Sequence, residues 1–381
     1  MSYPHRFAGL AILLAASSFN AWSDENVIDK WRLEPFWTGN VIHGESLFFL
    51  EPIPGSPAVA PLLFTPEAVL SLRHPATGAS YEEGPDYVID REARRIQRTP
   101  DSRIPFTTRQ DFEPPLGASG QQYRDGARDI FFGEGRKFHD LQVEITYRHS
   151  GSEWSEMNGP IPESAANALP GVMRKLRAVE PVTITLLGDS ISFGLNASGV
   201  VDAPPHQPAY GDLFAQALGA RFGGPITFHN PSVSGMSAAW GIEQAASVAA
   251  PRPDLVLIAF GMNDASGRLA PDQYAAQIAQ IMAAIRAAHP AAEFILVATM
   301  LGNADWIHAA PALYPQYRDA LKTLAGPGIA IADLTSVWET LLSRKTYADL
   351  TGNGVNHPND FGHRVYAQVL LSMIPRAEPP Q

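Results

Sequence analysis

Five short apolar runs in the second half of the chain constrain its fold more than any other feature. They show no regular alternation with polar residues, which indicates strands covered on both faces of a sheet. Segments with a helical pattern separate them, and this alternation predicts a parallel sheet with right-handed crossovers. The expected strands are residues 182–187, 226–229, 255–260, 294–299 and 329–332, and the expected helices are 210–221, 238–249, 271–288, 312–325, 336–344 and 360–373.

The first half of the chain has a different pattern. Residues 139–148 alternate apolar and polar side chains, as a half-buried strand does, and 46–50 and 87–90 are further strand candidates. Turns rich in proline and glycine separate these segments. We therefore expect a small antiparallel, sandwich-like β domain over 24–150, a connector over 151–180 and an α/β domain over 181–376.

The first 23 residues have the features of an export signal. A short basic start at His5 and Arg6 precedes an apolar run over 7–19, which is shorter than the ~20 residues of an ordinary membrane span. A small residue, Ser23, stands at the expected cleavage point. We predict an exported bacterial protein, periplasmic or extracellular, whose mature chain is not stably inserted in a membrane.

Charge and cysteine content exclude several kinds of partner. The formal net charge is −11 and no block of basic residues occurs, which argues against nucleic acid as a ligand. The absence of cysteine excludes disulfides, thiol catalysis and thiolate metal sites. No other pattern of metal ligands is present, so we expect neither a metal nor a cofactor.

Polar residues suited to one reaction follow the expected strands. Ser190 comes directly after the first strand, on a strand-to-helix turn, and Gly235 and Asn263 follow the second and third strands. His357 precedes the last helix. Because ligands of parallel sheets bind beyond the carboxyl ends of the strands, we expect these residues to lie close together.

This set of residues has the parts that acyl transfer needs. A serine hydroxyl becomes an effective nucleophile when a base takes its proton, and a histidine can do so and return the proton to the leaving group. We therefore expect Ser190 to be the nucleophile and His357 its base. The oxyanion would be held by the N–H groups of Ser190 and Gly235 and by the side-chain amide of Asn263.

The same residues carry a resemblance to a known family. Gly188-Asp189-Ser190, the glycine of the second loop, Gly261-Met262-Asn263-Asp264 and His357-Pro358-Asn359 resemble the four blocks of the SGNH (GDSL-like) hydrolase superfamily, in the family order. The resemblance covers about residues 181–374. It implies a flavodoxin-like, five-stranded parallel sheet and hydrolysis of esters. The Gly-x-Ser-x-Gly elbow of the α/β-hydrolases is absent.

One position departs from the superfamily pattern. Many members carry an aspartate three residues before the histidine, and here Gly354 stands there. We expect a main-chain carbonyl to orient His357 instead, giving a Ser–His dyad. Asp349 or Asp360 remains the alternative, as an acid that completes a triad from another loop.

Several other residues have two interpretations. Asp305 and His308 have Asp-x-x-His spacing but the wrong order for the base, so we expect them in the wall of the cleft. His363 is expected to be structural. His206 and Tyr210 lie in the loop after the nucleophile and are our candidates for substrate binding. Four aromatic residues of the β domain could stack on sugar rings but are more often core residues: Trp31, Trp37, Tyr81 and Tyr87.

The predicted function is therefore that of a secreted serine esterase, with O-acetyl groups on polysaccharide or oligosaccharide as its expected substrate. This layout resembles bacterial two-domain carbohydrate acetylesterases, and we expect the β domain to bind polymer without taking part in chemistry. The alternatives are a lipase, an aryl-esterase or an acyltransferase of the same fold. An alternative of another class is a catalytically idle carbohydrate-binding protein. The oligomeric state stays open.

Overall fold

The computed structural model describes residues 17–18 and 27–376, and its C-terminal part contains the predicted parallel sheet. The strand order is β11-β10-β12-β13-β14, and all four pairings are parallel. A two-residue strand, β1 (Ser17–Ser18), pairs antiparallel with β11. The predicted bounds hold to within one residue: β10 (Val182–Gly188), β11 (Ile226–His229), β12 (Leu255–Ala259), β13 (Glu293–Ala298) and β14 (Ile329–Asp333).

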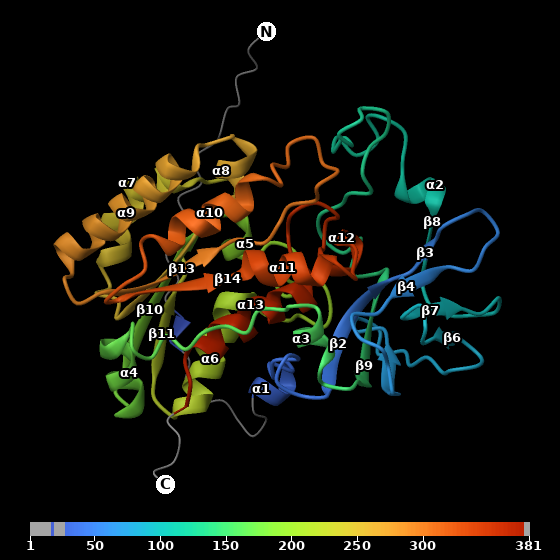
Figure 1. The fold of residues 1–381 in the computed structure, drawn as a ribbon, viewed down its shortest axis with the longest axis horizontal. Helices are drawn as coiled ribbons and strands as arrows, with labels where there is room; N and C mark the ends of the chain where they lie inside the picture. Colours follow the sequence, from blue (N-terminus) through green and yellow to red (C-terminus); the bar gives the residue numbers. More distant parts are fainter. Residues whose placement is uncertain (1–16, 19–26, 377–381) are drawn as a thin grey trace.

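Helices cover both faces of this sheet (Figure 1). On one face α6 packs against α13, and on the other α9 packs against both α7 and α10. The two faces together give the flavodoxin-like arrangement that the sequence predicts. The bounds are α6 (Tyr210–Phe222), α7 (Ala238–Ala249), α9 (Pro271–Ala288), α10 (Leu313–Lys322), α11 (Leu334–Leu342) and α13 (Asp360–Met373).

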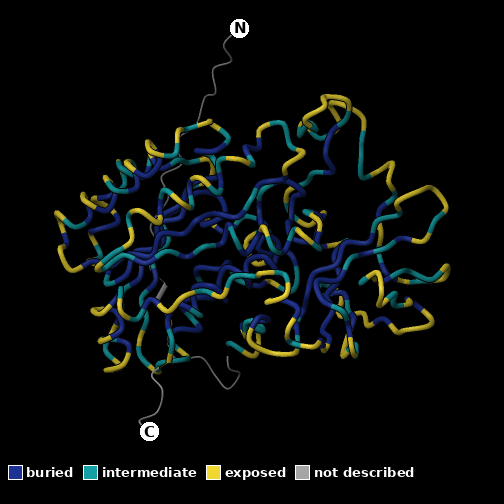
Figure 2. The backbone as a smooth tube through the Cα atoms, in the orientation of Figure 1, coloured by how far each residue is buried: buried dark blue, intermediate teal, exposed yellow. Residues whose placement is uncertain are grey.

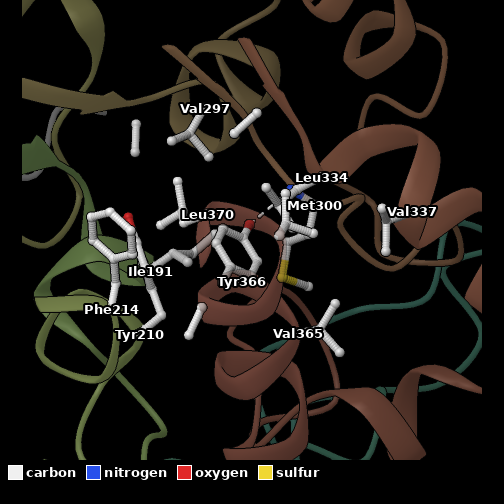
Figure 3. Packing of buried hydrophobic residues seen from close by; sticks show 14 of the residues in the cluster. Ile191, Tyr210, Phe214, Val297, Met300, Leu334, Val337, Val365, Tyr366 and Leu370 are labelled. Atoms are coloured by element: carbon white, nitrogen blue, oxygen red, sulfur yellow. Dashed lines mark hydrogen bonds between the residues drawn. The ribbon is translucent and has the colours of Figure 1, made fainter. Parts of the chain in front are cut away.

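The sheet is apolar because both of its faces are buried. Every residue of β12 and β13 is buried, and Figure 2 shows these strands dark blue between helices whose outer faces are exposed. Figure 3 shows side chains of α6, β13 and α13 packed together, among them Phe214, Val297 and Leu370. Tyr366 brings a polar atom into this core, and its hydroxyl accepts a hydrogen bond from the Met300 N–H at 2.9 Å.

The N-terminal region forms the predicted small β domain, which lies beside one end of the α/β domain (Figure 1). One sheet has the antiparallel order β2-β9-β5, and the other has the order β6-β7-β4-β3-β8, antiparallel except for the β3–β8 pair. The bounds are β2 (Val41–Phe48), β3 (Leu50–Glu51), β4 (Val59–Pro61), β5 (Ala68–Arg73), β6 (Tyr87–Asp90), β7 (Arg95–Arg98), β8 (Thr107–Thr108) and β9 (Gln142–Arg148).

Strand β9 corrects one expectation about this domain. Its alternating pattern predicts a half-buried strand, yet every residue except Arg148 is buried. The polar face of β9 packs against the α/β domain instead of facing water. Gln142 Nε2 donates to the carbonyls of Ala348 (2.7 Å) and Thr351 (2.8 Å), and Arg364 Nη1 donates to Glu144 Oε1 at 2.9 Å.

A second group of buried charges joins the two domains beside β2. Lys345 Nζ lies 2.6 Å from Glu45 Oε1, and neither side chain has any exposed surface. The Phe48 N–H donates to Asp349 Oδ1 at 2.8 Å, and the Tyr147 hydroxyl donates to Glu45 Oε2 at 2.6 Å. Hydrogen bonds and ion pairs between polar groups of both domains therefore hold the interface.

The aromatic residues proposed for sugar stacking belong to the core of the β domain. Trp37, Tyr81 and Tyr87 are buried, and Trp31 is half-buried against the same cluster. These rings have no open face on which a sugar could stack, apart from the exposed part of Trp31. The three buried rings are therefore core residues, which is the more common role that the sequence analysis gave for them, and the alternative of sugar stacking does not hold for these three.

Short helices complete the described chain: α1 (Val27–Lys30), α2 (Arg109–Phe112), α3 (Glu153–Glu156), α4 (Pro170–Arg177), α5 (Ser190–Phe193), α8 (Met262–Ser266) and α12 (Tyr347–Leu350). Two of them, α3 and α4, lie in the predicted connector. Within the part of the chain that the structure describes, no helix combines the length and apolar character needed to cross a bilayer. The predicted export signal lies outside the described residues except for Ser17–Ser18.

Candidate active site

Ser190 is the first residue of α5, immediately beyond the carboxyl end of β10. The Asp189 carboxylate caps the helix by accepting a hydrogen bond from the Ile191 N–H at 3.0 Å. The Ser190 N–H is one of the amide groups that a helix start leaves without an intrahelical acceptor. The residue is 5% exposed, so its hydroxyl lies at the base of the site.

Two aspartates beside the site hold loops in place. Burial raises the pKa of Asp189 to about 7. Asp264 accepts from the N–H groups of Ala238 and Gly261, both at 3.0 Å. Burial raises the pKa of Asp264 as well. These contacts give both side chains a structural role.

His357 lies in the loop between α12 and α13 and faces the serine. Its Nε2 is 3.0 Å from Ser190 Oγ, a hydrogen-bond distance for a base and its nucleophile. The Asn353 Oδ1 atom accepts from the N–H groups of Val355 (2.9 Å), Asn356 (3.0 Å) and His357 (3.2 Å). The structure thus brings the predicted nucleophile and base together, and Asn353 shapes the loop that holds the base.

Side chains, not a main-chain carbonyl, surround the other nitrogen of His357. Asn196 Oδ1 is 3.0 Å from Nδ1, Asn353 Nδ2 is 2.9 Å away, and Glu134 Oε1 is 3.4 Å away. Asn196 Nδ2 donates to the Gly352 carbonyl at 3.0 Å, which turns its oxygen toward the imidazole. The predicted main-chain carbonyl is therefore wrong, and a side-chain oxygen, Asn196 Oδ1, is the nearest of these possible acceptors to Nδ1.

The two aspartates considered for a triad are bound elsewhere. Asp349 accepts from the Phe48 N–H at 2.8 Å and from the Thr346 N–H at 2.9 Å. Asp360 Oδ1 accepts from the Ser198 N–H at 2.7 Å, and burial raises the pKa of Asp360. Both carboxylates hold backbone segments, so neither completes a triad.

The loops that carry the expected oxyanion donors are bonded to one another. The Val233 N–H donates to the Gly188 carbonyl at 3.2 Å, and Asn263 Nδ2 donates to the Met236 carbonyl at 2.9 Å. This leaves Asn263 a second amide hydrogen. Gly235 lies between these contacts with φ +80°, and no atom lies within 4 Å of the position that a Cβ would take. The three donors thus come from adjoining loops, with open space at Gly235.

A loop that joins the two domains borders the site. Asn303 ties this loop to the histidine loop, since its N–H donates to the Val355 carbonyl at 2.7 Å and its Nδ2 to the Gly354 carbonyl at 2.9 Å. Trp306 Nε1 donates to Gln121 Oε1 of the β domain at 2.9 Å. His308 lies at the exposed end of the loop, which fits a place in the wall rather than a role as the base.

The residues proposed for substrate binding have different outcomes. Tyr210 is fully buried, and its hydroxyl is 2.8 Å from Ser192 Oγ. Figure 3 shows it among core side chains, so the prediction that it contacts substrate is wrong. The His206 ring is exposed and lies 3.7 Å from Asp202, and its role in binding stays a prediction.

His363 is the structural residue that we expected. It is fully buried, and burial lowers its pKa to about 3, so the ring is neutral at physiological pH. Its Nε2 lies 3.2 Å from the Leu195 carbonyl. This contact fixes the chain that follows α5.

Sequence reasoning missed three residues around His357: Glu134, Asn196 and Asn353. Asn353 has a local signal, because an Asn-Gly pair next to the histidine is typical of a turn. No spacing connects Glu134 or Asn196 with His357, since contact depends on how the chain returns to the site. Among the described residues, no group of histidine, aspartate and glutamate side chains could hold a metal ion.

A serine on a strand-to-helix turn, a histidine in contact with it and adjoining loops with oxyanion donors are the parts that a serine hydrolase uses. Residues 186–365 match the profile of the GDSL-like Lipase/Acylhydrolase family, which confirms the resemblance found in the sequence. The match lies within the α/β domain and covers a little under half of the chain, and it makes that domain similar to the GDSL-like ester hydrolases. The β domain lies outside the match.

Similar solved structures are distant in sequence, and no curated protein sequence is significantly similar to this chain. A two-domain esterase active on acetylated mannans is 20% identical, with a TM-score of 0.44. The match covers 56% of this chain and 54% of the esterase, so this chain spans about half the length of that protein. The acetylxylan esterase Axe2 from Geobacillus stearothermophilus is 20% identical, with a TM-score of 0.42 over 52% of this chain and 97% of its own. A lipase from a goat rumen metagenome is 15% identical, with a TM-score of 0.41, and the match covers 50% of this chain and 97% of the lipase.

Proposed function

We propose that this hydrolase removes short acyl groups, acetyl above all, from carbohydrates. The observation that carries its chemistry is the 3.0 Å contact between His357 Nε2 and Ser190 Oγ. As Ser190 Oγ bonds to the acyl carbon, its proton passes to Nε2, and Nε2 then gives that proton to the leaving sugar oxygen. A water attacks the acyl-enzyme in the same way and releases the acid. The N–H groups of Ser190 and Gly235 and the amide of Asn263 stabilise the oxyanion in both steps.

The border of the site supports a carbohydrate substrate. Trp306 is partly exposed there, with its ring 5.3 Å from that of His308. The ring offers a flat apolar face suited to a sugar, and the bond from its Nε1–H to Gln121 fixes its orientation. Arg124 crosses from the β domain and donates to the carbonyls of Ala304 (3.1 Å) and Ala309 (3.0 Å), so the ring stands on a fixed loop.

One observation favours the alternative, a lipase or aryl-esterase. Phe193, at the end of the same short helix as Ser190, is 44% exposed, and Val200 in the following loop is 39% exposed. Apolar side chains near a nucleophile could contact a longer acyl chain. The length of the preferred acyl chain therefore separates the two functions.

The decisive experiment measures acetate release from a panel of acetylated polysaccharides together with turnover of p-nitrophenyl esters of increasing chain length. We expect acetate release and a steep fall in kcat/KM beyond the acetyl and propionyl esters. Trp306→Ala should raise KM for acetylated polysaccharide and leave the small ester unchanged. Phe106→Ala, which removes an exposed β-domain ring stacked on Arg98, serves as the control. Preference for long acyl chains, with no acetate released from any polysaccharide, contradicts the proposal.

We further propose that the protein acts outside the cytoplasm. The support is the sequence of residues 1–23, with its basic start and short apolar run. Fractionation of cells that express the full chain tests this proposal. Activity retained only in the cytoplasmic fraction would contradict it.

A further inference from the structure

We propose that Glu134, a residue of the β domain, is the positioning acid of the esterase, so that the working group is Ser190–His357–Glu134 and two domains build it. Nothing in the sequence pattern or the family match points to this residue, because the match begins at residue 186. The inference rests on ester hydrolysis by Ser190 and His357. It does not depend on the proposed carbohydrate substrate.

The first observation is the contact itself. Glu134 Oε1 lies 3.4 Å from His357 Nδ1, on the side of the ring opposite Ser190. Asn353 Nδ2 donates to the same oxygen at 3.4 Å. The Glu134 side chain is 46% exposed, so its carboxylate keeps part of its hydration while one oxygen faces the imidazole.

The charge state of Glu134 suits this role. Burial raises the pKa of the Glu134 carboxyl, but the hydrogen bond and charge of His357 and the amides of Asn353 and Asn196 outweigh burial and lower it below its ordinary value. Glu134 is therefore ionised wherever the histidine can act as a base. A full negative charge beside Nδ1 stabilises the imidazolium that forms when Ser190 gives up its proton.

The second observation is independent and concerns Gly354. This glycine has φ +82°, and a Cβ built on it would lie 2.3 Å from the Phe131 carbonyl oxygen and 2.9 Å from the Phe138 ring. The β-domain segment that carries Glu134 thus occupies the space where an aspartate side chain would start. Many relatives have an aspartate of the histidine loop at this position. In this chain the β-domain segment that contains Glu134 lies there instead.

The third observation explains why a charge is needed although Asn196 already accepts from Nδ1. The ring nitrogen faces an acceptor, Asn196 Oδ1 at 3.0 Å, and a donor, Asn353 Nδ2 at 2.9 Å. The donor favours the tautomer with the proton on Nε2, which cannot accept from Ser190. A carboxylate next to Nδ1 favours the proton on Nδ1 and so the reactive tautomer.

The experiment compares three variants on a small activated ester: Glu134→Gln, Glu134→Asp and, as a matched control, Asp140→Asn. The control removes the same charge from the same segment, where Asp140 pairs with Arg136 at 3.2 Å instead of His357. Losing the acid of a triad can cost ~10⁴-fold in kcat. Because Asn196 still accepts from Nδ1, we expect Glu134→Gln to lower kcat by roughly 10²-fold with little change in KM.

The pH profile separates this role from a merely structural one. Without the carboxylate the imidazolium is less stable, so the acid limb of kcat/KM should move to lower pH by about one unit. Asp189, Asp264, Asp360 and His363 of the α/β domain are unchanged in these variants. His139 of the β domain, which interacts electrostatically with Asp360 and His363, is unchanged as well. Glu134→Asp, which keeps the charge, should keep the wild-type acid limb and recover part of kcat, while Asp140→Asn should match wild type.

Two outcomes would overturn the proposal. One is a Glu134→Gln enzyme whose kcat lies within threefold of the wild-type value and whose kcat/KM profile keeps its acid limb at the wild-type pH. The other is an equal loss in the Gln and Asp variants without any shift of the limb, which would indicate a packing role. Turnover of the small ester by wild type, and its loss in Ser190→Ala, establishes the Ser–His chemistry separately, so failure of the Glu134 proposal is distinguishable from failure of that chemistry.

Discussion

The sheet of the α/β domain and strand β9 of the β domain are both buried, but they reach burial by opposite means. Strands β12 and β13 are almost entirely apolar and are covered by helices of their own domain. Strand β9 buries Gln142, Glu144 and Thr146 as well, and the first two bond to the neighbouring domain. The first surface is covered by helices of the same domain, whereas two polar side chains of the second bond to the neighbouring domain.

The difference teaches that the β domain is part of the hydrolase rather than an attached module. Gln142 and Glu144 of β9 and the buried Lys345–Glu45 pair bond across the boundary, so the two domains form one packed unit. The packing of the β domain against the α/β domain also places the segment from Phe131 to Glu134 next to the histidine loop. The expectation that this domain takes no part in chemistry is replaced by the proposal that it supplies an acid.

The largest expected effect concerns the α/β domain alone. Ser190→Ala should lower kcat by roughly 10⁴-fold or more, because the nucleophile is lost and only binding and the oxyanion donors remain. Esterase assays with purified protein check this, and Ser234→Ala, in the exposed second loop, is the control. A Ser190→Ala enzyme that keeps a tenth of wild-type turnover would move the chemistry to another residue.

The next largest effect concerns the interface. Lys345→Met removes the cation from a pair with no exposed surface and leaves Glu45 buried without it. We expect a loss of about 3–5 kcal/mol in the free energy of unfolding, measured by urea denaturation. Arg95→Ala breaks an exposed ion pair with Asp90 within the β domain and should cost less than about 1 kcal/mol. Equal costs for the two variants would show that the interface is not tightly buried.

The last effect depends on pH, is small near neutral pH, and tests burial of a single ring in the α/β domain. The pKa of His363 is about 3 in the folded protein, below the ~6.5 of an exposed histidine. Between these pH values His363 is therefore protonated in the unfolded chain and neutral in the folded chain. Wild type should therefore lose stability relative to His363→Gln as pH falls from about 6.5 toward 3, by roughly 1 kcal/mol per pH unit. Melting curves of both proteins across this range check the slope, and a constant difference would argue against a buried neutral ring.

The sequence predicted the α/β domain well for a physical reason. Its strands are apolar runs between helical segments, and its nucleophile and base stand beside recognisable local motifs. Strand β9 was assigned correctly but its polar face was placed in water, because alternation cannot tell solvent from a polar partner domain.

The contacts of His357 were predictable only in part. Gly354 showed that the usual aspartate is missing, but it could not show what replaces it. Glu134 lies in an irregular segment with no periodicity, and Asn196 is far from His357 in sequence. Their contacts depend on tertiary packing, and Gly354 becomes informative only when the Phe131 carbonyl is seen beside it.

The central claim, that the hydrolase consists of both domains, is tested most directly by hydrogen exchange during urea denaturation of the full chain, with esterase activity followed in parallel. We predict that β9 and β12 lose protection with one urea midpoint and that hydrolysis of a small ester disappears at that same midpoint. Loss of protection in β9 at lower urea, while β12 stays protected and the small ester is still hydrolysed at the wild-type rate, would contradict the claim.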